Sequence, residues 1–381
     1  MISPARTVAF DVLLDTHRGG YASDLLLART TPLDSRDAGL AHELVFGCLR
    51  YQGQLDFLCQ HYSGRPRLDL EVRVAVRLGI YQLRYLERIP NHAAVGESVE
   101  LVKRARMRSA AGLVNAVLRK VGREPVEWPD LPTELSAPAW LLEKWESDYG
   151  PDIAHNIARA ALREPETWVR WTGPELPELE PTNVPGAYLV RSGVPPPGSR
   201  LQDIGAQSIV PLLALEPGHT FLDVCAAPGN KTAQALESGV SAIACDLHPK
   251  RLANVTGCRR VVLDASRPLP FSATFDRILV DAPCSGTGTL ARNPEIKWRL
   301  GPGVLAGLAS LQRLILRNAL NHLAPGGRVV YSTCSLEKEE NQDVVSAVID
   351  RVPGVRRVET VQRIPGVEPG DGFFAAVLAL I

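Results

Sequence analysis

Hydrophobic positions in the first third of the chain recur at helical spacing. In residues 6–18 they fall on Val8, Ala9, Val12 and Leu13, and Gly19-Gly20 follows. This spacing predicts an amphipathic helix, and the glycine pair predicts its end. Similar segments cover residues 37–58, 69–86, 91–105 and 109–121. Because no strand-like alternation persists among them, we expect an all-helical bundle of about five to seven helices.

The pattern changes after residue 122, where prolines become frequent. They stand at positions 125, 129, 132 and 138, which predicts a linker. Two helical segments, 140–145 and 153–162, a short strand at 169–171 and a proline-rich tract, 174–197, follow. We therefore expect three parts: a helical domain over 1–125, a linker with a small α+β module over 126–202, and a third domain over 203–381.

From residue 203 onward, short apolar runs alternate with helical segments. Runs of Val, Ile and Leu without alternation are typical of strands buried on both faces of a parallel sheet. The predicted strands cover residues 221–225, 242–246, 260–263, 276–280, 328–331 and 373–380, and the predicted helices cover 232–237, 249–255, 304–322 and 339–350. Repeated strand–helix units predict a doubly wound parallel sheet of the α/β class.

A cysteine follows each of two predicted strands. Cys284 comes after Asp281-Ala-Pro, and Cys334 comes after Ser332-Thr333. In open α/β sheets ligands bind outside the carboxyl ends of the strands, so both thiols are expected to face one crevice. A lone cysteine is more often a small buried hydrophobic residue. Two cysteines, both in turns rich in Gly, Ser and Thr, favour chemistry.

Composition narrows the class of protein. Hydrophobic residues make up 45% and charged residues 22%, as in ordinary globular proteins. The absence of a long apolar run or a signal-peptide pattern predicts a protein without a membrane partner, located in the cytoplasm. The seven cysteines are scattered without a C-x-x-C pair, so we expect neither a metal site nor a disulfide framework.

Charge is uneven although the net charge is zero. Residues 1–122 hold 17 Lys and Arg against 12 Asp and Glu, an excess of +5 that is compatible with a polyanionic partner. The densest basic cluster is 103–108. It is interpreted either as a phosphate-contacting patch or as a solvated helix end, where cations favour the helix dipole.

The turn after the strand at 221–225 predicts a nucleotide-like ligand site. Small residues in Ala226-Ala-Pro-Gly229 let the backbone approach a ligand. Asp246, at the end of the next strand, is placed to bond a ribose hydroxyl pair, and Asp264 to accept from an adenine amino group. A turn with few glycines suits an adenosine ligand without phosphates, such as S-adenosylmethionine. The alternative is that these aspartates are helix N-caps.

Several motifs in order carry a resemblance to a known family. They are Cys225-Ala-Ala-Pro-Gly-Asn-Lys231, Asp281-Ala-Pro-Cys-Ser-Gly-Thr-Gly288, Asn293-Pro-Glu-Ile-Lys-Trp298, Ser332-Thr-Cys-Ser335 and Asp371-Gly-Phe-Phe374. The chain thereby resembles the Sun/Fmu family of RNA 5-methylcytosine methyltransferases. Its beginning, together with Asn115-Ala-Val-Leu-Arg119, resembles the NusB-like RNA-binding domain fused to the catalytic domain in the bacterial ribosomal branch. The resemblance implies a class I methyltransferase, Rossmann-like sheet after the helical domain.

The resemblance also assigns roles by position. It implies that S-adenosylmethionine is held by Cys225, Ala226, Ala227, Pro228, Gly229, Asn230, Lys231, Asp246, Asp264 and Asp281. It makes Cys334 the nucleophile that adds to carbon 6 of cytosine and Cys284 its helper in release of the carbon 5 proton. We further expect Asp281, if protonated or shared with a donor, to stabilise the charge that develops at ring nitrogen 3. Asn230 stands where the family has a second glycine; asparagine tolerates left-handed backbone, so the cofactor is expected to bind still. For Lys231 a surface position is the simpler interpretation.

The expected partner is ribosomal RNA, bound by a monomer at a cytosine that is unpaired or flipped out of its helix. The resemblance favours the small subunit (16S) RNA. Arg292, Lys297 and Trp298 are candidate RNA contacts, with core packing as the alternative for Trp298. The alternatives for function are the same chemistry on tRNA or 23S rRNA, an amino-methyltransferase, and a non-catalytic RNA-binding adaptor. Asp-Ala-Pro-Cys284 disfavours the second, and the intact cysteine pair disfavours the third.

Overall fold

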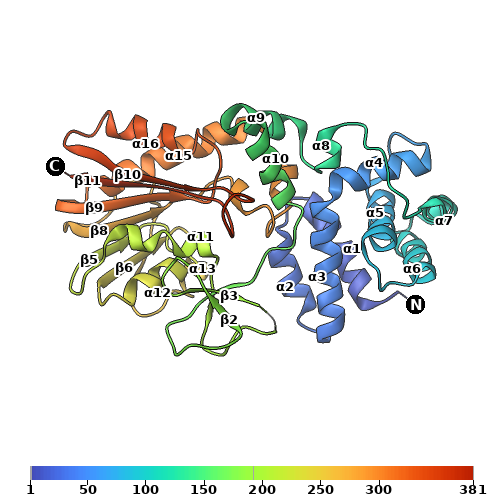
Figure 1. Ribbon diagram of the computed structural model, residues 1–381, viewed down its shortest axis with the longest axis horizontal. Coiled ribbons are helices and arrows are strands. Elements are labelled where there is room, and N and C mark those ends of the chain that lie inside the picture. The colour runs from blue at the N-terminus through green and yellow to red at the C-terminus, as the bar shows by residue number, and fades with distance from the viewer. Residues whose placement is uncertain (1, 192, 381) are drawn as a thin grey trace. The chain divides into compact units, whose positions relative to one another are not determined.

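The structure is a computed structural model that describes residues 2–191 and 193–380 (Figure 1). It forms two compact units, one up to Arg163 together with Ala291–Arg299, and one comprising Glu164–Leu290 and the chain from Leu300 onward. Among the described residues, no helix is both long and apolar enough to span a membrane.

The first unit is all-helical, as predicted. Its helices are α1 (Pro4–His17), α2 (Ala22–Thr30), α3 (Ser35–Arg50), α4 (Gln52–Ser63), α5 (Leu70–Tyr85), α6 (Asn91–Arg104), η1 (Arg108–Ala110), α7 (Ala111–Lys120), α8 (Leu131–Glu134), α9 (Ala139–Tyr149), α10 (Pro151–Ala160) and α14 (Ile296–Arg299). The apolar stripes of α1 and α3 to α7 share one core, which includes the fully buried Phe10, Leu44 and Leu78.

Two details of the helical prediction were wrong. The segment 37–58 is not one helix, because Tyr51 leaves helical geometry (φ −95°, ψ 16°) and separates α3 from α4. Helix α2 was missed. Its two buried residues, Ala22 and Leu26, are too few to produce a clear hydrophobic stripe in the sequence.

The stretch 126–202 is divided between the two units. Helices α8 to α10 belong to the first unit, whereas the strands that follow Glu164 belong to the second. These strands form a small antiparallel sheet in the order β2-β3-β1-β4. Its members are β1 (Trp168–Arg170), β2 (Leu179–Pro181), β3 (Ala187–Val190) and β4 (Arg200–Leu201). Of these only β1 was predicted, because β2 and β3 lie in the proline-rich tract, β4 comes just after it, and these three strands are two to four residues long.

The second unit is built on a larger, mostly parallel sheet. In the described chain its order is β10-β11-β9-β8-β5-β6-β7. The strands are β5 (Thr220–Asp223), β6 (Ser241–Asp246), β7 (Arg259–Val262), β8 (Phe275–Asp281), β9 (Leu323–Thr333), β10 (Val355–Arg363) and β11 (Phe373–Leu380). The helical elements are α11 (Ile204–Gln207), η2 (Val210–Leu213), α12 (Asn230–Leu236), α13 (Pro249–Leu252), η3 (Thr287–Thr289), α15 (Pro302–Leu320) and α16 (Gln342–Ile349). This confirms the predicted α/β class.

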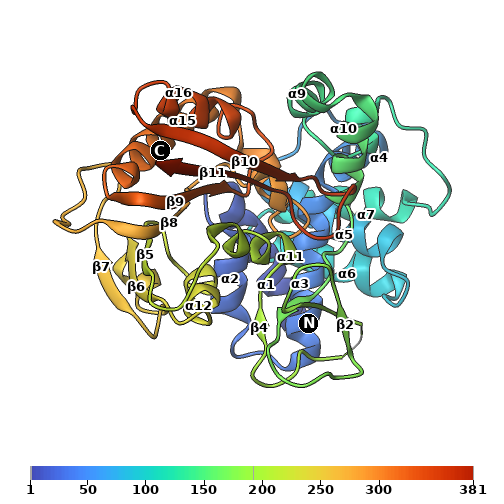
Figure 2. The ribbon, with the colours of Figure 1, turned by 60° about the vertical axis from the view of Figure 1, so that its left-hand side comes forward.

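Helices cover both faces of this sheet, α15 and α16 on one and α11 to α13 on the other (Figures 1 and 2). Successive residues of a central strand therefore enter different cores. Val329 and Tyr331 pack on the side of α15 and α16, while Val330 between them packs with the η2 residues on the opposite side. Burial on both faces explains why these strands read as unbroken apolar runs.

The sheet is not parallel throughout. Strand β11 runs antiparallel to β9, and β10 runs antiparallel to β11 at the edge. The sequence pattern did not predict β10. Most of its side chains are exposed, so its sequence, V-R-R-V-E-T-V-Q-R, lacks the apolar character of its neighbours. Exposed edge strands commonly carry such charges, which discourage pairing with other chains.

Candidate active site at the carboxyl ends of the sheet

The candidate site residues gather where four parallel strands end. Strands β5, β6, β8 and β9 run in one direction, so their carboxyl ends share one edge of the sheet. Asp246 is the last residue of β6, Asp281 the last of β8, and Cys334 directly follows β9. The predicted cofactor loop, 225–231, follows β5. The topology therefore brings residues that are about a hundred positions apart in sequence to one edge.

The loop after β5 turns at Gly229. This glycine has φ +109°, and a Cβ atom there would lie 3.0 Å from Val255 Cγ2. Both the backbone angle and the close packing therefore favour glycine at this position. Asn230 is the first residue of α12 and does not adopt a left-handed backbone. The expected tolerance of asparagine for that conformation is therefore not needed at this position. Asn230 Nδ2 donates to the Leu201 carbonyl at 3.2 Å.

Two of the predicted carboxylates are held by backbone and hydroxyl donors. Asp246 accepts from Ala227 N at 3.1 Å and from His248 N at 2.8 Å. Asp264 lies just beyond β7 and accepts from Ser266 N at 3.0 Å and from Ser266 Oγ at 2.6 Å. The Ser266 hydroxyl, the Ser266 backbone amide and the nearby Arg267 together lower the pKa of Asp264. A carboxylate offers about four acceptor positions, so both keep capacity for a ligand hydroxyl or amino group.

Lys231 forms a half-buried ion pair with Asp281. Its Nζ lies 2.7 Å from Asp281 Oδ2 and 4.9 Å from the centre of the Phe373 ring. Ser332 Oγ donates to the other oxygen of Asp281 at 2.8 Å. Burial is the largest single effect and lowers the pKa of Lys231, but the charge and hydrogen bond of Asp281, together with the charges of Cys334 and Asp223, outweigh burial and raise the pKa overall. Lys231 is thus a largely enclosed partner of Asp281, with a side chain that is 12% exposed, which contradicts the simpler expectation of a surface lysine.

The two thiols are in contact. Cys284 Sγ lies 3.3 Å from Cys334 Sγ, and both side chains are half-buried. This confirms that the two strand ends bring both cysteines to one place. The hydrogen bond with Cys334 raises the pKa of Cys284 most, followed by burial and by the charges of Cys334 and Glu340. The half-buried loop cysteine Cys225 also has a raised pKa, because of desolvation and of the neighbouring Asp223 and Asp281 carboxylates.

Sequence reasoning missed two buried carboxylates near the site. Asp223 ends β5, is 1% exposed and accepts from Thr232 Oγ1 at 2.6 Å. Burial raises its pKa to about 7. Glu340 is fully buried and bonds to the residues that follow the two cysteines. Asp223 had a signal, as an acid at the end of an apolar run. Glu340 had none, because an acid in a charged turn before a helix is usually exposed.

The motif 293–298 does not lie in the second unit. It belongs to the helical unit, where Lys297 Nζ donates to the Arg50 carbonyl at 2.9 Å and Trp298 Nε1 to the Leu49 carbonyl at 2.8 Å. Lys297 is 2% exposed. Its burial contradicts the expectation that Lys297 contacts RNA, whereas the half-buried Trp298 stays a candidate RNA contact. Arg292 is half-buried.

The basic cluster 103–108 fits both of its interpretations in part. Lys103 and Arg104 end α6 and are paired, Lys103 with Glu100 at 2.7 Å and Arg104 with Asp11 at 2.7 Å. Arg106 and Arg108 lie beyond the helix, are exposed, and make no ion pair with any residue that the structure describes.

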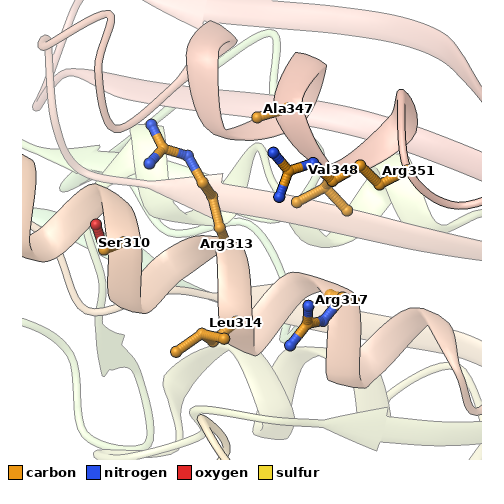
Figure 3. A pocket seen from close by; sticks show the side chains of 7 residues that line it. All are labelled: Ser310, Arg313, Leu314, Arg317, Ala347, Val348 and Arg351. Carbon is orange, nitrogen blue, oxygen red and sulfur yellow. The ribbon is translucent and has the colours of Figure 1, made fainter.

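A separate pocket of about 280 Å³ lies between α15 and α16. Figure 3 shows Arg313 and Arg317 extending from α15 on one side, with Arg351 just beyond α16 on the other. It contains none of the residues predicted to bind cofactor or to react. The candidate site is thus the edge that carries the two thiols and the Lys231–Asp281 pair.

This strand order, with an antiparallel β10–β11 edge and acids at the carboxyl ends of β6 and β8, defines a Rossmann-like methyltransferase catalytic domain. Two family models match the chain: "16S rRNA methyltransferase RsmB/F" over residues 210–379 and "NusB family" over residues 3–123. The chain belongs to the RsmB/F family of 16S rRNA methyltransferases, with a NusB-like N-terminal part, which confirms the resemblance seen in the motifs.

Individual relatives agree along nearly the whole chain. The "Ribosomal RNA small subunit methyltransferase B" of Klebsiella pneumoniae is 33% identical over 408 aligned residues, covering 95% of this chain and 94% of that protein. A solved structure titled PH0851 has a TM-score of 0.83 at 20% identity and covers 100% of this chain and 99% of its own. A "Methyltransferase Homolog Protein from Pyrococcus Horikoshii" has a TM-score of 0.57 at 22% identity and covers 66% and 97%. At these identities the two structures support the fold alone.

Proposed function

We propose that this protein transfers a methyl group from S-adenosylmethionine to carbon 5 of a cytosine in small-subunit ribosomal RNA, through a covalent bond between Cys334 and the base. The observation that carries the proposal is the 3.3 Å contact between Cys284 and Cys334, in the same site as the Lys231–Asp281 pair. Family membership supports the methyl donor and the ribosomal substrate.

The residues around the loop after β5 fit an adenosine-containing donor. The loop turns tightly at Gly229, and Asp246 and Asp264 retain acceptor positions for ribose hydroxyls and an adenine amino group. When bound, S-adenosylmethionine supplies an electrophilic methyl group on a sulfonium. The loop around the bound donor would be shaped by Cys225, Ala226, Ala227, Pro228 and Asn230.

The thiolate of Cys334 starts the reaction by bonding to carbon 6 of cytosine. The electron pair of the 5,6 double bond moves toward carbon 5, which otherwise is a poor nucleophile and now can take the methyl group. Negative charge that develops toward ring nitrogen 3 is stabilised by the Lys231–Asp281 pair, in which Lys231 is the proton donor. A thiolate is the reactive form of cysteine and also a suitable leaving group, so the bond to carbon 6 is reversible.

Cys284 completes the reaction as a base. Two of the causes that raise its pKa, the hydrogen bond with Cys334 and the charge of Cys334, disappear once the Cys334 sulfur is bonded to carbon 6. Cys284 then releases its proton to solvent more readily. Its thiolate takes the proton of carbon 5, whose electron pair restores the 5,6 double bond and expels the Cys334 thiolate. The contact with Cys334 therefore keeps Cys284 protonated before the covalent bond forms, and the loss of that contact allows Cys284 to act as a base afterwards.

The test is to supply the purified protein with labelled S-adenosylmethionine and with 16S rRNA, 23S rRNA or tRNA, and to identify the labelled nucleoside by mass spectrometry. Label in 5-methylcytidine from 16S rRNA is expected. Label at the exocyclic nitrogen would overturn the cysteine mechanism. Label confined to 23S rRNA or tRNA would leave the mechanism standing and replace the substrate. Binding of RNA and of the donor without transfer would favour an adaptor.

A further inference from the structure

Glu340 links the loops that carry the two reactive thiols. It lies just before α16 and is fully buried. Ser285, the residue after Cys284, donates its backbone amide to Glu340 Oε1 at 2.9 Å and its hydroxyl to Oε2. Ser335, the residue after Cys334, donates its hydroxyl to the same Oε2 at 2.5 Å. One carboxylate therefore holds the neighbours of both cysteines.

The acceptor positions of this carboxylate are filled by neutral donors. Gln312, from the middle of α15, provides the fourth, with Nε2 at 2.9 Å from Glu340 Oε1. The same Nε2 also lies 2.9 Å from the carbonyl oxygen of Pro283, the residue before Cys284. Four donors match the four acceptor positions of an ionised carboxylate. No lysine, arginine or histidine in residues 2–191 or 193–380 forms an ion pair with Glu340.

The backbone around Glu340 is fixed from the same strand that presents Cys334. Tyr331 donates its hydroxyl to the Glu340 carbonyl at 2.5 Å. The next residue, Asn341, accepts from Thr333 Oγ1 at 2.5 Å and donates to the Ser335 carbonyl at 2.9 Å. Thr333 and Ser335 flank Cys334, so the Glu340–Asn341 pair holds both sides of that cysteine.

We propose that Glu340 is a positioning residue for the two-cysteine reaction: its carboxylate joins the Cys284 and Cys334 loops and thereby keeps the two thiols in contact. The role in catalysis rests on the function proposed above, whereas the positioning of the sulfur atoms does not. A buried charge without a cation is costly in a protein interior. The negative charge of Glu340 also contributes to raising the pKa of Cys284, after the larger effects of Cys334 and burial.

Three substitutions distinguish the effect of the length of the Glu340 side chain from the effect of its charge. Glu340→Gln keeps the length of the side chain, and both serine hydroxyls can turn to accept from the new amide. Glu340→Asp keeps the charge but is one methylene shorter, so it cannot hold both loops. Glu340→Ala removes the link. Glu237→Gln is the matched control, because Glu237 also bridges two segments of the same unit, through Arg170 of β1 and Arg200 of β4 in the small sheet.

The direct readout is cross-linking of Cys284 to Cys334 by diamide, which takes the two thiol hydrogens, is reduced to its hydrazine and leaves a disulfide. The full-length protein is used without RNA, and peptide mass spectrometry identifies the cross-link. Since a displacement of about 1 Å can cost about a hundredfold in the rate of a positioned reaction, Glu340→Ala and Glu340→Asp are expected to cross-link about ten- to a hundredfold more slowly. Glu340→Gln and Glu237→Gln are expected to stay close to wild type.

The comparison is made per folded molecule, with circular dichroism and the thermal midpoint measured in parallel. A lower thermal midpoint with an unchanged cross-linking rate in Glu340→Ala would show that Glu340 is structural only and would overturn the proposal. Loss in Glu340→Gln as large as in Glu340→Ala would overturn it as well. The failure of the proposed function is seen separately, as methylation that persists in Cys334→Ala, and it would leave the cross-linking result unaffected.

Discussion

The Nζ atom of Lys231 lies 2.7 Å from Oδ2 of Asp281. Lys231 comes from the loop and helix after β5, and Asp281 ends β8, so this ion pair connects the loop predicted to hold the methyl donor with the strand that leads to Cys284. Ser332, at the end of β9, donates to the same carboxylate. Three strand ends therefore converge on one charge pair, and its loss should affect the reaction itself.

Lys231→Met is expected to lower the turnover number by about a hundredfold or more, the usual contribution of a positioned proton donor. Methionine retains the contact with Phe373 but provides neither the proton nor the charge. Single-turnover methylation of 16S rRNA measures the effect, and fluorescence titration with S-adenosylhomocysteine checks that the loop still binds. Lys250→Met, on the exposed surface of α13, is the control. An unchanged turnover number in Lys231→Met would remove this pair from the mechanism.

The two cysteines are expected to fail at different steps. Cys334→Ala should abolish methylation without forming any adduct, because no sulfur remains to bond to carbon 6. Cys284→Ala should accumulate a covalent protein–RNA adduct, because the carbon 5 proton is not removed. Denaturing gel electrophoresis with labelled RNA detects the adduct.

Cys258→Ala provides the control, because this half-buried cysteine directly precedes the edge strand β7. The variant should retain both activity and a transient adduct level like that of wild type. If Cys334→Ala still methylates RNA, or still forms a covalent adduct with it, the assignment of Cys334 as the nucleophile is contradicted.

Asp223→Asn should change how stability depends on pH. The pKa of Asp223 is raised to about 7 in the folded protein, against about 3.9 in an unfolded chain. Between these values the folded state keeps a proton that the unfolded state has lost. The free energy of unfolding of the wild type therefore falls as pH rises, by at most about 1.4 kcal/mol per pH unit, and levels off above pH 7.

The asparagine variant has no carboxyl group to ionise, so its free energy of unfolding does not fall with pH for this reason, and its amide oxygen still accepts from Thr232. Urea unfolding of both proteins at pH 5, 6, 7 and 8 should show the variant gaining relative stability up to about pH 7. A constant difference across this range would mean that Asp223 is ionised at every pH in the series.

Lys297 should affect the pH dependence of the free energy of unfolding in the opposite direction, and Lys297→Met should reveal it. Burial, followed by the charge of Arg50, lowers the pKa of Lys297 to about 7, against about 10.4 in an unfolded chain. Between these values the unfolded state binds the proton that the folded state has released, so the wild type gains stability as pH rises from 7 to 10. Below pH 7 the amine is charged in both states and the cost of burying it is fully present.

Lys297→Met should thus be most favourable relative to wild type near pH 6.5 and lose that advantage by pH 9, at a rate of at most about 1.4 kcal/mol per pH unit. The midpoints of urea unfolding measure it. Lys120→Met, at the exposed end of α7, should show no such trend. If the stability of Lys297→Met relative to wild type depends on pH no more than that of Lys120→Met, the amine of Lys297 lies in solvent.

Much of the fold could be predicted from local patterns. Helices such as α1, α5 and α6 present apolar residues at helical spacing, and strands such as β8 and β11 read as apolar runs because both of their faces are covered. The elements that were missed have weak patterns for a physical reason. Helix α2 has only two buried residues, and β10 is an exposed edge strand. Tyr51 ends α3 without glycine or proline, so nothing in the residue types marked the break.

By itself the sequence determined the α/β class, the family and the candidate reactive residues, because strand-end residues and motif order are local properties of a chain. Only the tertiary structure decided which of them meet. It placed Cys284 against Cys334 and buried Lys231 against Asp281, because parallel strands bring distant carboxyl ends to one edge of the sheet. It also assigned the 293–298 motif to the helical unit and revealed Glu340 between the cysteine loops. Those outcomes depend on packing between remote segments, which the spacing of residues along one segment does not encode.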